Sequence, residues 1–483
     1  MSQSFNILKQ PKPFYLIFFI EMWERFGYYG LQALLSVYLV RQLGMEDSDA
    51  FVTFGAFSAL VFGLVAVGGY VGDNIFGTRR TIVLGALVMM TGYLLMAFSG
   101  HNVTIVYLAL GTIAVGNGLF KANPSSLLAK CYEEGDGRLD GAFTLYYMAI
   151  NIGSFFSISL VPYIAEYFGW SVGFMVSAIG LLVAVSNYFF MRHWVEDYGS
   201  EPDFRPVPWK TRGVLYLCVI AACGGSAWLL EHVQLANILL ALISTGALVM
   251  FFREIMMASG GERRKMIVVL ILMLQAVVFF VMYMQMPTSL NFFAINNVET
   301  HILGFTINPV TYQSLNPFWI MVASPVLAWF YNRNESGGGG LSMPTKFALG
   351  MLFTAVSFLV LPLGALWASE MGVVAPGWLV LSYFFQAIGE LLISGLGLAM
   401  VAQLVPERLH GFIMGVWFLT SSTASVIAGH VAGFTAVGTG EAATPLATLP
   451  VYSQFFTNMG LISLAVGLIM LFSAHRLDRM ISD

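Results

Sequence analysis

Uninterrupted apolar runs of about 20 residues recur along the whole chain, and this feature restricts its fold more than any other. Only 10% of the 483 residues are charged and 58% are hydrophobic, whereas roughly 25% of the residues in a soluble globular protein are charged. A membrane β-barrel would show alternating segments of about ten residues instead. The sequence therefore predicts an all-α polytopic membrane protein with fourteen spans. These are 14–40, 51–71, 81–99, 104–124, 143–164, 171–191, 213–231, 235–252, 266–293, 315–331, 343–366, 376–401, 409–434 and 454–474.

The Lys and Arg residues indicate the orientation of these spans. If the N-terminus is cytoplasmic, 19 of the 22 Lys and Arg residues lie on the cytoplasmic side. Arg25 and Lys121 fall inside spans, and only Arg41 lies at an outer loop. Because cytoplasmic loops carry an excess of Lys and Arg, both termini are expected in the cytoplasm. The polar start of the chain also argues against a cleavable signal peptide before the first span.

Two linkers suggest how the spans are grouped. A polar, Pro-rich segment at 192–212 separates the first six spans from the rest, and a glycine-rich segment lies at 334–342. Spans 213–231 and 235–252 contain few polar groups and are interpreted as an inserted hairpin. The expected domains are an N-terminal six-helix bundle at 1–191, the linker and hairpin at 192–260, and a C-terminal six-helix bundle at 261–483. Two helical bundles with a site near mid-membrane are typical of secondary transporters.

Nothing in the sequence indicates a cofactor. The three cysteines, Cys131, Cys218 and Cys223, lack the spacing of a metal or redox site. We therefore expect no metal and no cofactor other than coupling protons, and no nucleic-acid partner.

The first span contains three charged residues, Glu21, Glu24 and Arg25. A charged side chain in hydrocarbon costs from about 2.5 to more than 10 kcal/mol, so three of them require a polar interior. Helical spacing places all three on one face, which Tyr28 and Tyr29 continue. This helix is expected to line a polar pathway.

Two further charges lie within spans. Apart from Lys346 at the cytoplasmic end of span 343–366, Lys121 is the only lysine within a span. A buried ammonium either loses its proton or pairs with a carboxylate, for which Glu21 and Glu24 are candidates. Alternatively, Lys121 ends its span and reaches the headgroups. Glu390 lies in the second bundle and would make a cavity with Arg25 and Lys121 bipolar, suited to a zwitterion. Its alternative is a structural bond to a neighbouring helix.

A third pattern follows the second span. Residues 69–80 (GYVGDNIFGTRR) resemble the inner-loop signature of the major facilitator superfamily. The resemblance implies that Asp73, Arg79 and Arg80 form a latch that stabilises one conformation. An ordinary turn rich in positive charge is the alternative.

Three motifs resemble signatures of one family within that superfamily. Residues 21–30 (EMWERFGYYG), 120–123 (FKAN) and 146–155 (YYMAINIGSF) are similar, in this order, to motifs of the proton-dependent oligopeptide transporters. The likeness runs from about Lys12 to Arg479 and includes the inserted hairpin typical of bacterial members. It implies the major facilitator fold, with two six-helix bundles and the hairpin.

The resemblance also implies a function: proton-coupled symport of dipeptides and tripeptides across the bacterial inner membrane by alternating access. The expected partners are these peptides, protons and membrane lipid, and the expected state is a monomer. By position, the resemblance implies that Arg25 and Lys121 bind the peptide carboxylate and that Glu390 and Asn316 bind the amino end. It implies that Asn151 binds the peptide backbone and that the pocket is lined by Tyr28, Tyr29 and Trp417. The proton would be carried by Glu21 and Glu24, paired with Arg25 or Lys121.

The chain departs from the family pattern at two places. Phe62 stands where relatives often have tyrosine, and the predicted span 266–293 lacks the acid that many relatives carry there. A drug or sugar transporter of the same superfamily remains the alternative function, although a neutral sugar needs no opposed charges. An intramembrane hydrolase is not expected, because no nucleophile with a base or metal ligands is evident.

Overall fold

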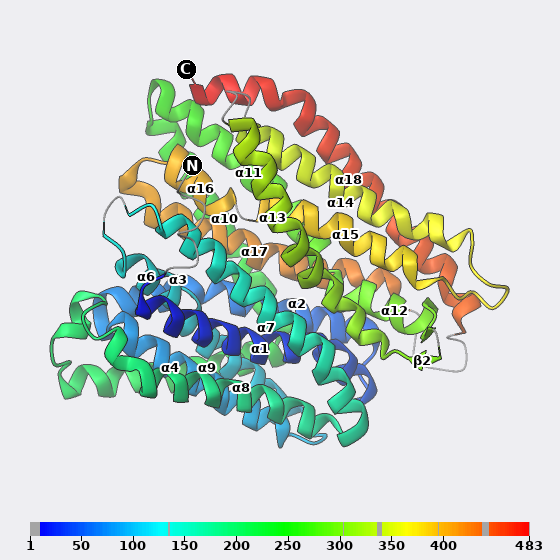
Figure 1. Cartoon of the computed structure of the whole chain (residues 1–483), viewed down its shortest axis with the longest axis horizontal. Coiled ribbons are helices and arrows are strands. Elements are labelled where there is room, and N and C mark those ends of the chain that lie inside the picture. The colour runs from blue at the N-terminus through cyan, green and yellow to red at the C-terminus, as the bar shows by residue number, and fades with distance from the viewer. Residues whose placement is uncertain are drawn as a thin grey trace. The chain divides into compact units, whose positions relative to one another are not determined.

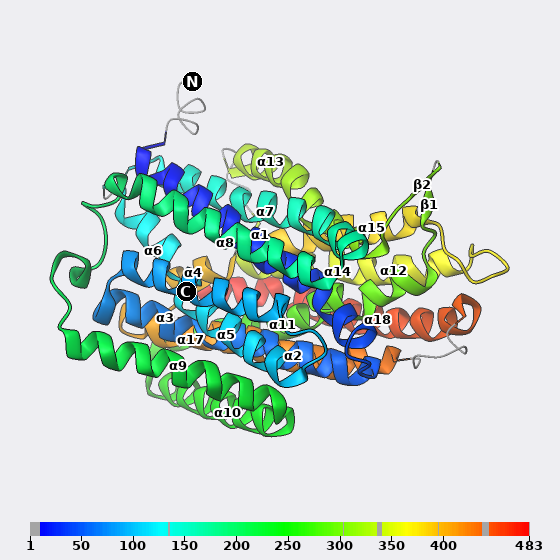
Figure 2. The same cartoon turned by 90° about the horizontal axis from the view of Figure 1, so that it is seen from below.

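The computed structural model describes residues 10–133, 136–302, 304–335, 341–394, 396–436 and 444–482, and Figures 1 and 2 show it from two sides. Each of the fourteen predicted spans coincides with one helix or with consecutive helices. Among the described residues, twelve helices are long and apolar enough to cross a membrane. The charged first helix and α13 are not among the twelve. The prediction of an all-α polytopic membrane protein is confirmed.

The helices have the following bounds in chain order: α1 (Lys12–Arg41), α2 (Asp47–Gly63), α3 (Val65–Tyr70), α4 (Thr78–Ala97), α5 (Val103–Lys121), α6 (Asn123–Lys130), α7 (Leu139–Phe168), α8 (Trp170–Met191), α9 (Trp209–Glu231), α10 (Val233–Met257), α11 (Gly260–Tyr283), α12 (Asn291–Asn297), α13 (Leu315–Glu335), α14 (Met343–Ala365), α15 (Pro376–Ile393), α16 (Leu396–Leu404), α17 (His410–Ala432) and α18 (Pro445–Ser482). Two short strands, β1 (His301–Ile302) and β2 (Phe305–Thr306), pair antiparallel outside the predicted spans.

The chain forms two compact units. Unit 1 comprises Met1–Tyr38 and Leu60–Ala236, and unit 2 comprises Leu39–Ala59 and Asn237–Asp483. The predicted hairpin is therefore divided, because α9 belongs to unit 1 and most of α10 to unit 2. The domain boundaries expected at 191 and 260 stay a prediction.

In unit 1, α5 packs on α4 and α9, and α7 approaches α1 closely at Gly153 and Ser157. A Cβ on Gly153 of α7 would overlap the backbone carbonyl of Met22, so only glycine permits this approach. Four residues further along α7, the Ser157 hydroxyl donates to the backbone carbonyl of Phe26 at 2.5 Å. These contacts fix the charged stretch of α1 inside the unit.

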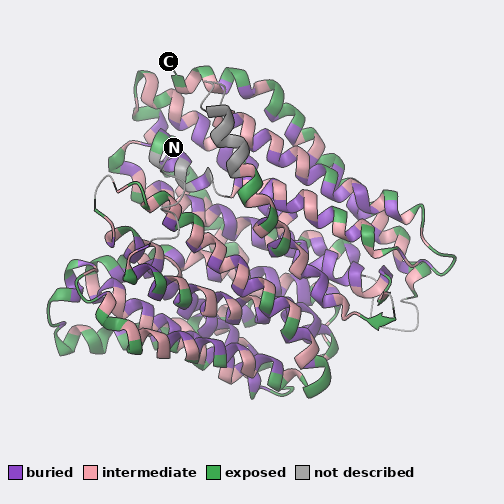
Figure 3. Ribbon diagram, viewed as in Figure 1, coloured by how far each residue is buried: buried purple, intermediate pink, exposed green. Residues whose placement is uncertain are grey.

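In unit 2, α14 packs along α15 and α18, and these helices run side by side in Figure 1. Figure 3 shows buried and exposed residues alternating along them, as expected for helices with one packed face. Phe293, Tyr452 and Phe456 form an aromatic core with ring centroids 5.2 to 6.1 Å apart.

The structure differs from the prediction in the span 266–293, which is not one continuous helix. The helix α11 ends at Tyr283, a π-helical turn covers Met286–Leu290, and α12 begins at Asn291. Pro287 lacks a backbone N–H, and Thr288 has non-helical φ/ψ angles of −118° and −105°. Most of the glycine-rich linker predicted at 334–342 lies outside the described residues.

Candidate functional site

A buried cluster of two acids and one base lies on α1. Glu21, Glu24 and Arg25 are 2%, 0% and 2% exposed. The Nε atom of Arg25 lies 3.3 Å from Oε1 of Glu21 and also contacts Oε2 of Glu24. The structure thus brings the three charges together, and one guanidinium serves both carboxylates.

Polar side chains from other helices of unit 1 complete this cluster. The Tyr146 hydroxyl of α7 hydrogen bonds the Glu21 side chain. The amide of Asn117 in α5 donates to Oε1 of Glu24 at 3.5 Å. The carboxylates therefore have polar partners on three helices.

The two tyrosines predicted to line the pocket lie one turn beyond the acids. The guanidinium carbon of Arg25 lies 5.3 Å from the centroid of the Tyr28 ring, and the rings of Tyr28 and Tyr29 meet edge to face at 5.4 Å. This geometry suits a cation–π contact, so Tyr28 supports Arg25 as well as bordering it.

Lys121 ends α5, and its ammonium lies over the ring of Phe62, 4.6 Å from the centroid. Among the described residues it makes no direct salt bridge, so the pairing expected with Glu21 or Glu24 is not formed, although both carboxylates attract it electrostatically. Arg25 occupies both acids instead. Sequence reasoning treated Phe62 only as a lost hydroxyl and missed that its ring supports the lysine.

Asn151 lies on α7 and is 4% exposed. Its Nδ2 donates to the backbone carbonyl of Tyr147 at 2.8 Å, within the same helix. The role in binding a peptide backbone stays a prediction.

Unit 2 contains the buried acid Glu390 of α15, which is 7% exposed. Its Oε2 accepts a hydrogen bond of 2.9 Å from Nδ2 of Asn316 in α13, so the structure brings together the two residues expected at the amino end of a peptide. Trp417 of α17 packs against Phe280 of α11, with ring centroids 5.9 Å apart. That Arg25, Lys121 and Glu390 share one chamber stays a prediction.

The residues expected to form a latch do not pair with one another. Asp73 accepts from Lys130 at 2.9 Å, and the same ammonium lies 3.3 Å from the Thr78 hydroxyl. Arg79 and Arg80 instead bind the segment 195–205, mainly through its backbone carbonyls. The latch function stays a prediction. In the structure, Asp73 pairs with Lys130 and not with Arg79 or Arg80.

Asp203 organises the contact between that segment and the turn before α4. Its Oδ2 accepts from the backbone N–H groups of Arg79 at 3.2 Å and of Ser200 at 3.1 Å. Gly77 permits this approach, because its φ is +102° and a Cβ there would overlap the Asp203 carboxylate. Sequence reasoning missed Ser200 and Asp203, although their spacing is that of a capping box.

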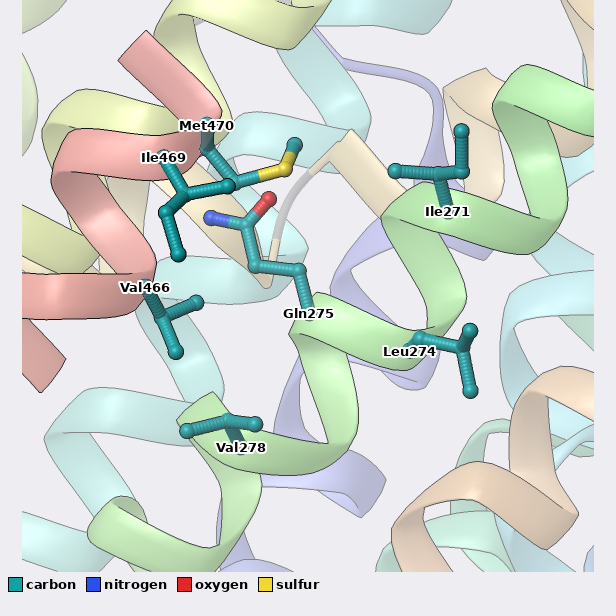
Figure 4. Close-up of a pocket in the computed structure, with 7 residues that line it drawn as sticks. All are labelled: Ile271, Leu274, Gln275, Val278, Val466, Ile469 and Met470. Atoms are coloured by element: carbon teal, nitrogen blue, oxygen red, sulfur yellow. The ribbon is translucent and has the colours of Figure 1, made fainter. Parts of the chain in front are cut away.

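A cavity of about 230 Å³ lies between α11 and α18. Figure 4 shows the Gln275 amide among apolar side chains, and the lining residues are Ile271, Leu274, Gln275, Val278, Val466, Ile469 and Met470. None of the predicted site residues lines it, and it is smaller than ligand pockets of roughly 300–1,000 Å³. In the part of the chain that the structure describes, no group of three or more His, Cys, Asp or Glu residues is arranged to hold a metal ion.

Comparisons with known proteins agree on one family. The POT family model matches residues 79–469. The chain is 54% identical over 482 residues to dipeptide and tripeptide permease A of Escherichia coli, covering 100% of this chain and 96% of that one. It is 56% identical over 477 residues to the protein of the same name from Edwardsiella piscicida, covering 99% and 97%.

Solved structures give the same result. The structure of tetrameric PepTSo2 matches with a TM-score of 0.88 and 38% identity, covering 97% of this chain and 99% of that one. The structure of a peptide transporter POT in complex with sulfate matches with a TM-score of 0.83 and 28% identity, covering 98% and 96%. These matches confirm the family resemblance, the major facilitator fold, and the prediction of a transporter and not an enzyme.

Proposed function

We propose, on the premise that this chain belongs to the POT family of transporters, that it imports dipeptides and tripeptides together with protons across the bacterial inner membrane, with both termini in the cytoplasm. The observation that carries the coupling mechanism is the buried cluster in which Arg25 serves both Glu21 and Glu24. Both relatives are dipeptide and tripeptide permeases, which supports the peptide substrate.

The cluster supports proton coupling because its charges depend on one another. With both acids ionised, Arg25 is held by two carboxylates. When Glu21 or Glu24 takes a proton, that carboxyl no longer attracts the guanidinium, and Arg25 or Lys121 becomes available to a peptide carboxylate. When the proton leaves on the cytoplasmic side, the ion pair reforms and the peptide is expelled.

The amino end of the peptide is assigned to unit 2. Glu390 with Asn316 offers a carboxylate that a peptide ammonium can bind through charge-assisted hydrogen bonds. Each residue adds at most about 3.3–3.6 Å of extended chain, so fixed charges at both ends select short peptides by length. Recognition of the two termini and the backbone leaves the side chains free to vary.

The proton gradient supplies enough free energy for accumulation. One charge moving down a potential of 100 mV yields about 2.3 kcal/mol, and one pH unit yields about 1.36 kcal/mol. One proton per peptide would therefore support roughly a hundredfold or greater accumulation.

The test is uptake of labelled dialanine into proteoliposomes with an imposed inside-negative, inside-alkaline gradient. Glu21→Gln and Glu24→Gln are expected to abolish uphill uptake while retaining counterflow, because binding persists without the titrating acid. Glu46→Gln, at an exposed acid outside the cluster, is the matched control and should behave as the wild type. Full proton-driven accumulation in both cluster variants would refute the assignment. Competition by sugars but not by peptides would favour the alternative substrate class.

A further inference from the structure

The carboxylate of Glu24 has two hydrogen-bond partners among the described residues, Arg25 and Asn117. Asn117 is 0% exposed, and its bond from Nδ2 to Oε1 of Glu24 is 3.5 Å long. Ordinary N–H···O bonds measure about 2.7–3.2 Å, so this contact is weak. The other polar atom of the same amide, Oδ1, is buried without a hydrogen-bond partner.

The amide of Asn117 differs from the charged groups around Glu24 because it can both donate and accept a hydrogen bond. An ionised carboxylate only accepts hydrogen bonds, so Asn117 must present Nδ2 to it. A protonated carboxyl carries an O–H donor, which needs an acceptor. The amide of Asn117 carries both kinds of atom on one plane, and rotation by about 180° exchanges them.

We propose that Asn117 is a positioning residue that follows the protonation state of Glu24, donating through Nδ2 to the carboxylate and accepting through Oδ1 from the protonated acid. This inference rests on the proposed function, in which Glu24 takes a coupling proton. In the step, the incoming proton forms an O–H bond on Oε1 of Glu24, and the Nδ2–H···Oε1 hydrogen bond is replaced by Oε1–H···Oδ1. No other covalent bond changes.

The remaining titratable groups near Glu24 do not offer this exchange. Interactions with Glu24 come from Glu21, Arg25 and Tyr28 on α1, Tyr93 on α4, Lys121 on α5 and Tyr146 on α7. Arg25 and Lys121 only donate, and an ionised Glu21 only accepts. The tyrosine hydroxyls can do both, but within the described residues none of them is hydrogen bonded to Glu24, whereas Asn117 is.

The geometry sets the direction of the expected effect. Without the amide, the carboxylate of Glu24 loses one long bond and keeps Arg25. The protonated acid loses its acceptor in a buried place, where an unmade hydrogen bond is costly. Removing the amide therefore disfavours the protonated form, and the midpoint of the pH profile of proton-driven uptake should fall by about 0.5 to 1 pH unit.

The experiment measures uphill dialanine uptake and counterflow as functions of pH in proteoliposomes containing the full chain. Asn117→Leu keeps a similar volume and removes both polar atoms, and Asn117→Gln restores the amide. Ser177→Ala is the matched control, because Ser177 is also a fully buried polar residue of unit 1 with an unpartnered oxygen but makes no hydrogen bond to Glu24. We expect a lower midpoint in Asn117→Leu, a return toward the wild type in Asn117→Gln, and no change in Ser177→Ala.

An unchanged or raised midpoint in Asn117→Leu would overturn the inference. If that variant does not fold, Asn117→Ala, which also removes both polar atoms, is measured in its place, and infrared difference spectra recorded on a pH step provide a second readout. The carboxyl band that disappears in Glu24→Gln belongs to Glu24, and it should move to higher frequency when the acceptor Oδ1 is removed. An unmoved band would also overturn it. If Glu21→Gln and Glu24→Gln both retain full uphill uptake, the proposed function has failed. If only Glu24→Gln retains it, or if Glu24→Gln loses it but the Asn117 variants are unaffected, this inference alone has failed.

Discussion

The buried acids of the two units are held in different ways. In unit 1, Glu21 and Glu24 share the guanidinium of Arg25, so one positive charge contacts two carboxylates of the same helix. In unit 2, Oε2 of Glu390 on α15 accepts a hydrogen bond from the amide of Asn316, which lies on another helix, α13. Glu21 and Glu24 are at most 2% exposed, and Glu390 is 7% exposed.

This difference suggests a division of labour. An acid that shares a counter-charge changes the whole ion-pair arrangement when it takes a proton, and this suits coupling. An acid that accepts a hydrogen bond from a neutral amide can still bind an ammonium group as a carboxylate, and this suits recognition of a peptide amino end. Substitutions in each unit can separate proton coupling from recognition of the peptide amino end.

Arg25→Ala should have the largest effect, because it leaves two buried carboxylates without their cation. Breaking a buried ion pair by removing one partner costs about 3–5 kcal/mol. We expect a markedly lower thermal unfolding midpoint in detergent and no uphill uptake. The combined variant Glu21→Gln, Glu24→Gln and Arg25→Leu should recover stability without transport. If Arg25→Ala were as stable as the wild type, Arg25 would not be needed to stabilise the buried carboxylates of Glu21 and Glu24.

Glu390→Gln should change binding more than stability, because the side-chain oxygen of glutamine can still accept the hydrogen bond from Asn316 but carries no charge for a peptide ammonium. A hydrogen bond to a charged group contributes about 1.5–3 kcal/mol, so affinity for dialanine should fall about 10- to 100-fold. Binding of N-acetylated dialanine should be unaffected, because it lacks the ammonium. Glu370→Gln, at an exposed acid of unit 2, is the control. Equal losses for both peptides would contradict the assignment of the amino end.

Phe62→Leu tests whether the aromatic ring supports Lys121. Cation–π contacts contribute about 0.5–2 kcal/mol, so the KM for dialanine should rise about 2- to 30-fold. Phe62→Tyr keeps the ring face and should remain near the wild-type KM. If Phe62→Leu has the same KM as the wild type, the ring of Phe62 does not position Lys121. The electrostatic attraction of Glu21 and Glu24 would then be sufficient to position it.

Lys130→Met should have the smallest effect on stability. The Lys130 and Asp73 side chains are 32% and 50% exposed, and exposed ion pairs contribute about 0.2–1 kcal/mol. The unfolding midpoint should therefore shift far less than in Arg25→Ala. A loss of uptake with unchanged stability would show that the Asp73 pair acts in the transport cycle, as the latch prediction requires. A shift as large as that of Arg25→Ala would break the distinction between buried and exposed pairs.

Local sequence patterns predicted the helices well, because membrane spans depend mainly on the length and polarity of a single segment. All fourteen spans correspond to helices, and the charges on α1 lie together as helical spacing required. The pattern failed at Pro287, where hydropathy remains high while the backbone leaves the helix. Hydropathy does not detect a missing backbone N–H donor, so the prediction from hydropathy missed the break in the helix at Pro287.

Pairing between side chains far apart in the sequence was harder to predict. Lys121 was expected to bind a carboxylate but lies over Phe62, and Arg79 was expected to interact with Asp73 but lies beside Asp203. For Arg79, more than one acid of suitable charge was available; for Lys121, the actual neighbour is an uncharged aromatic ring, which matching of opposite charges does not consider. Charge alone did not decide among them.

The sequence by itself determined the membrane class, the spans and the family, because each depends on local composition or on short motifs. Only the tertiary structure decided which acid binds which base, that Asn117 reaches Glu24, and that the segment 195–205 binds Arg79 and Arg80. The physical reason is that a hydrogen bond or ion pair requires atoms within about 3–4 Å, and helix packing sets those distances between residues 93 to 122 positions apart in the chain.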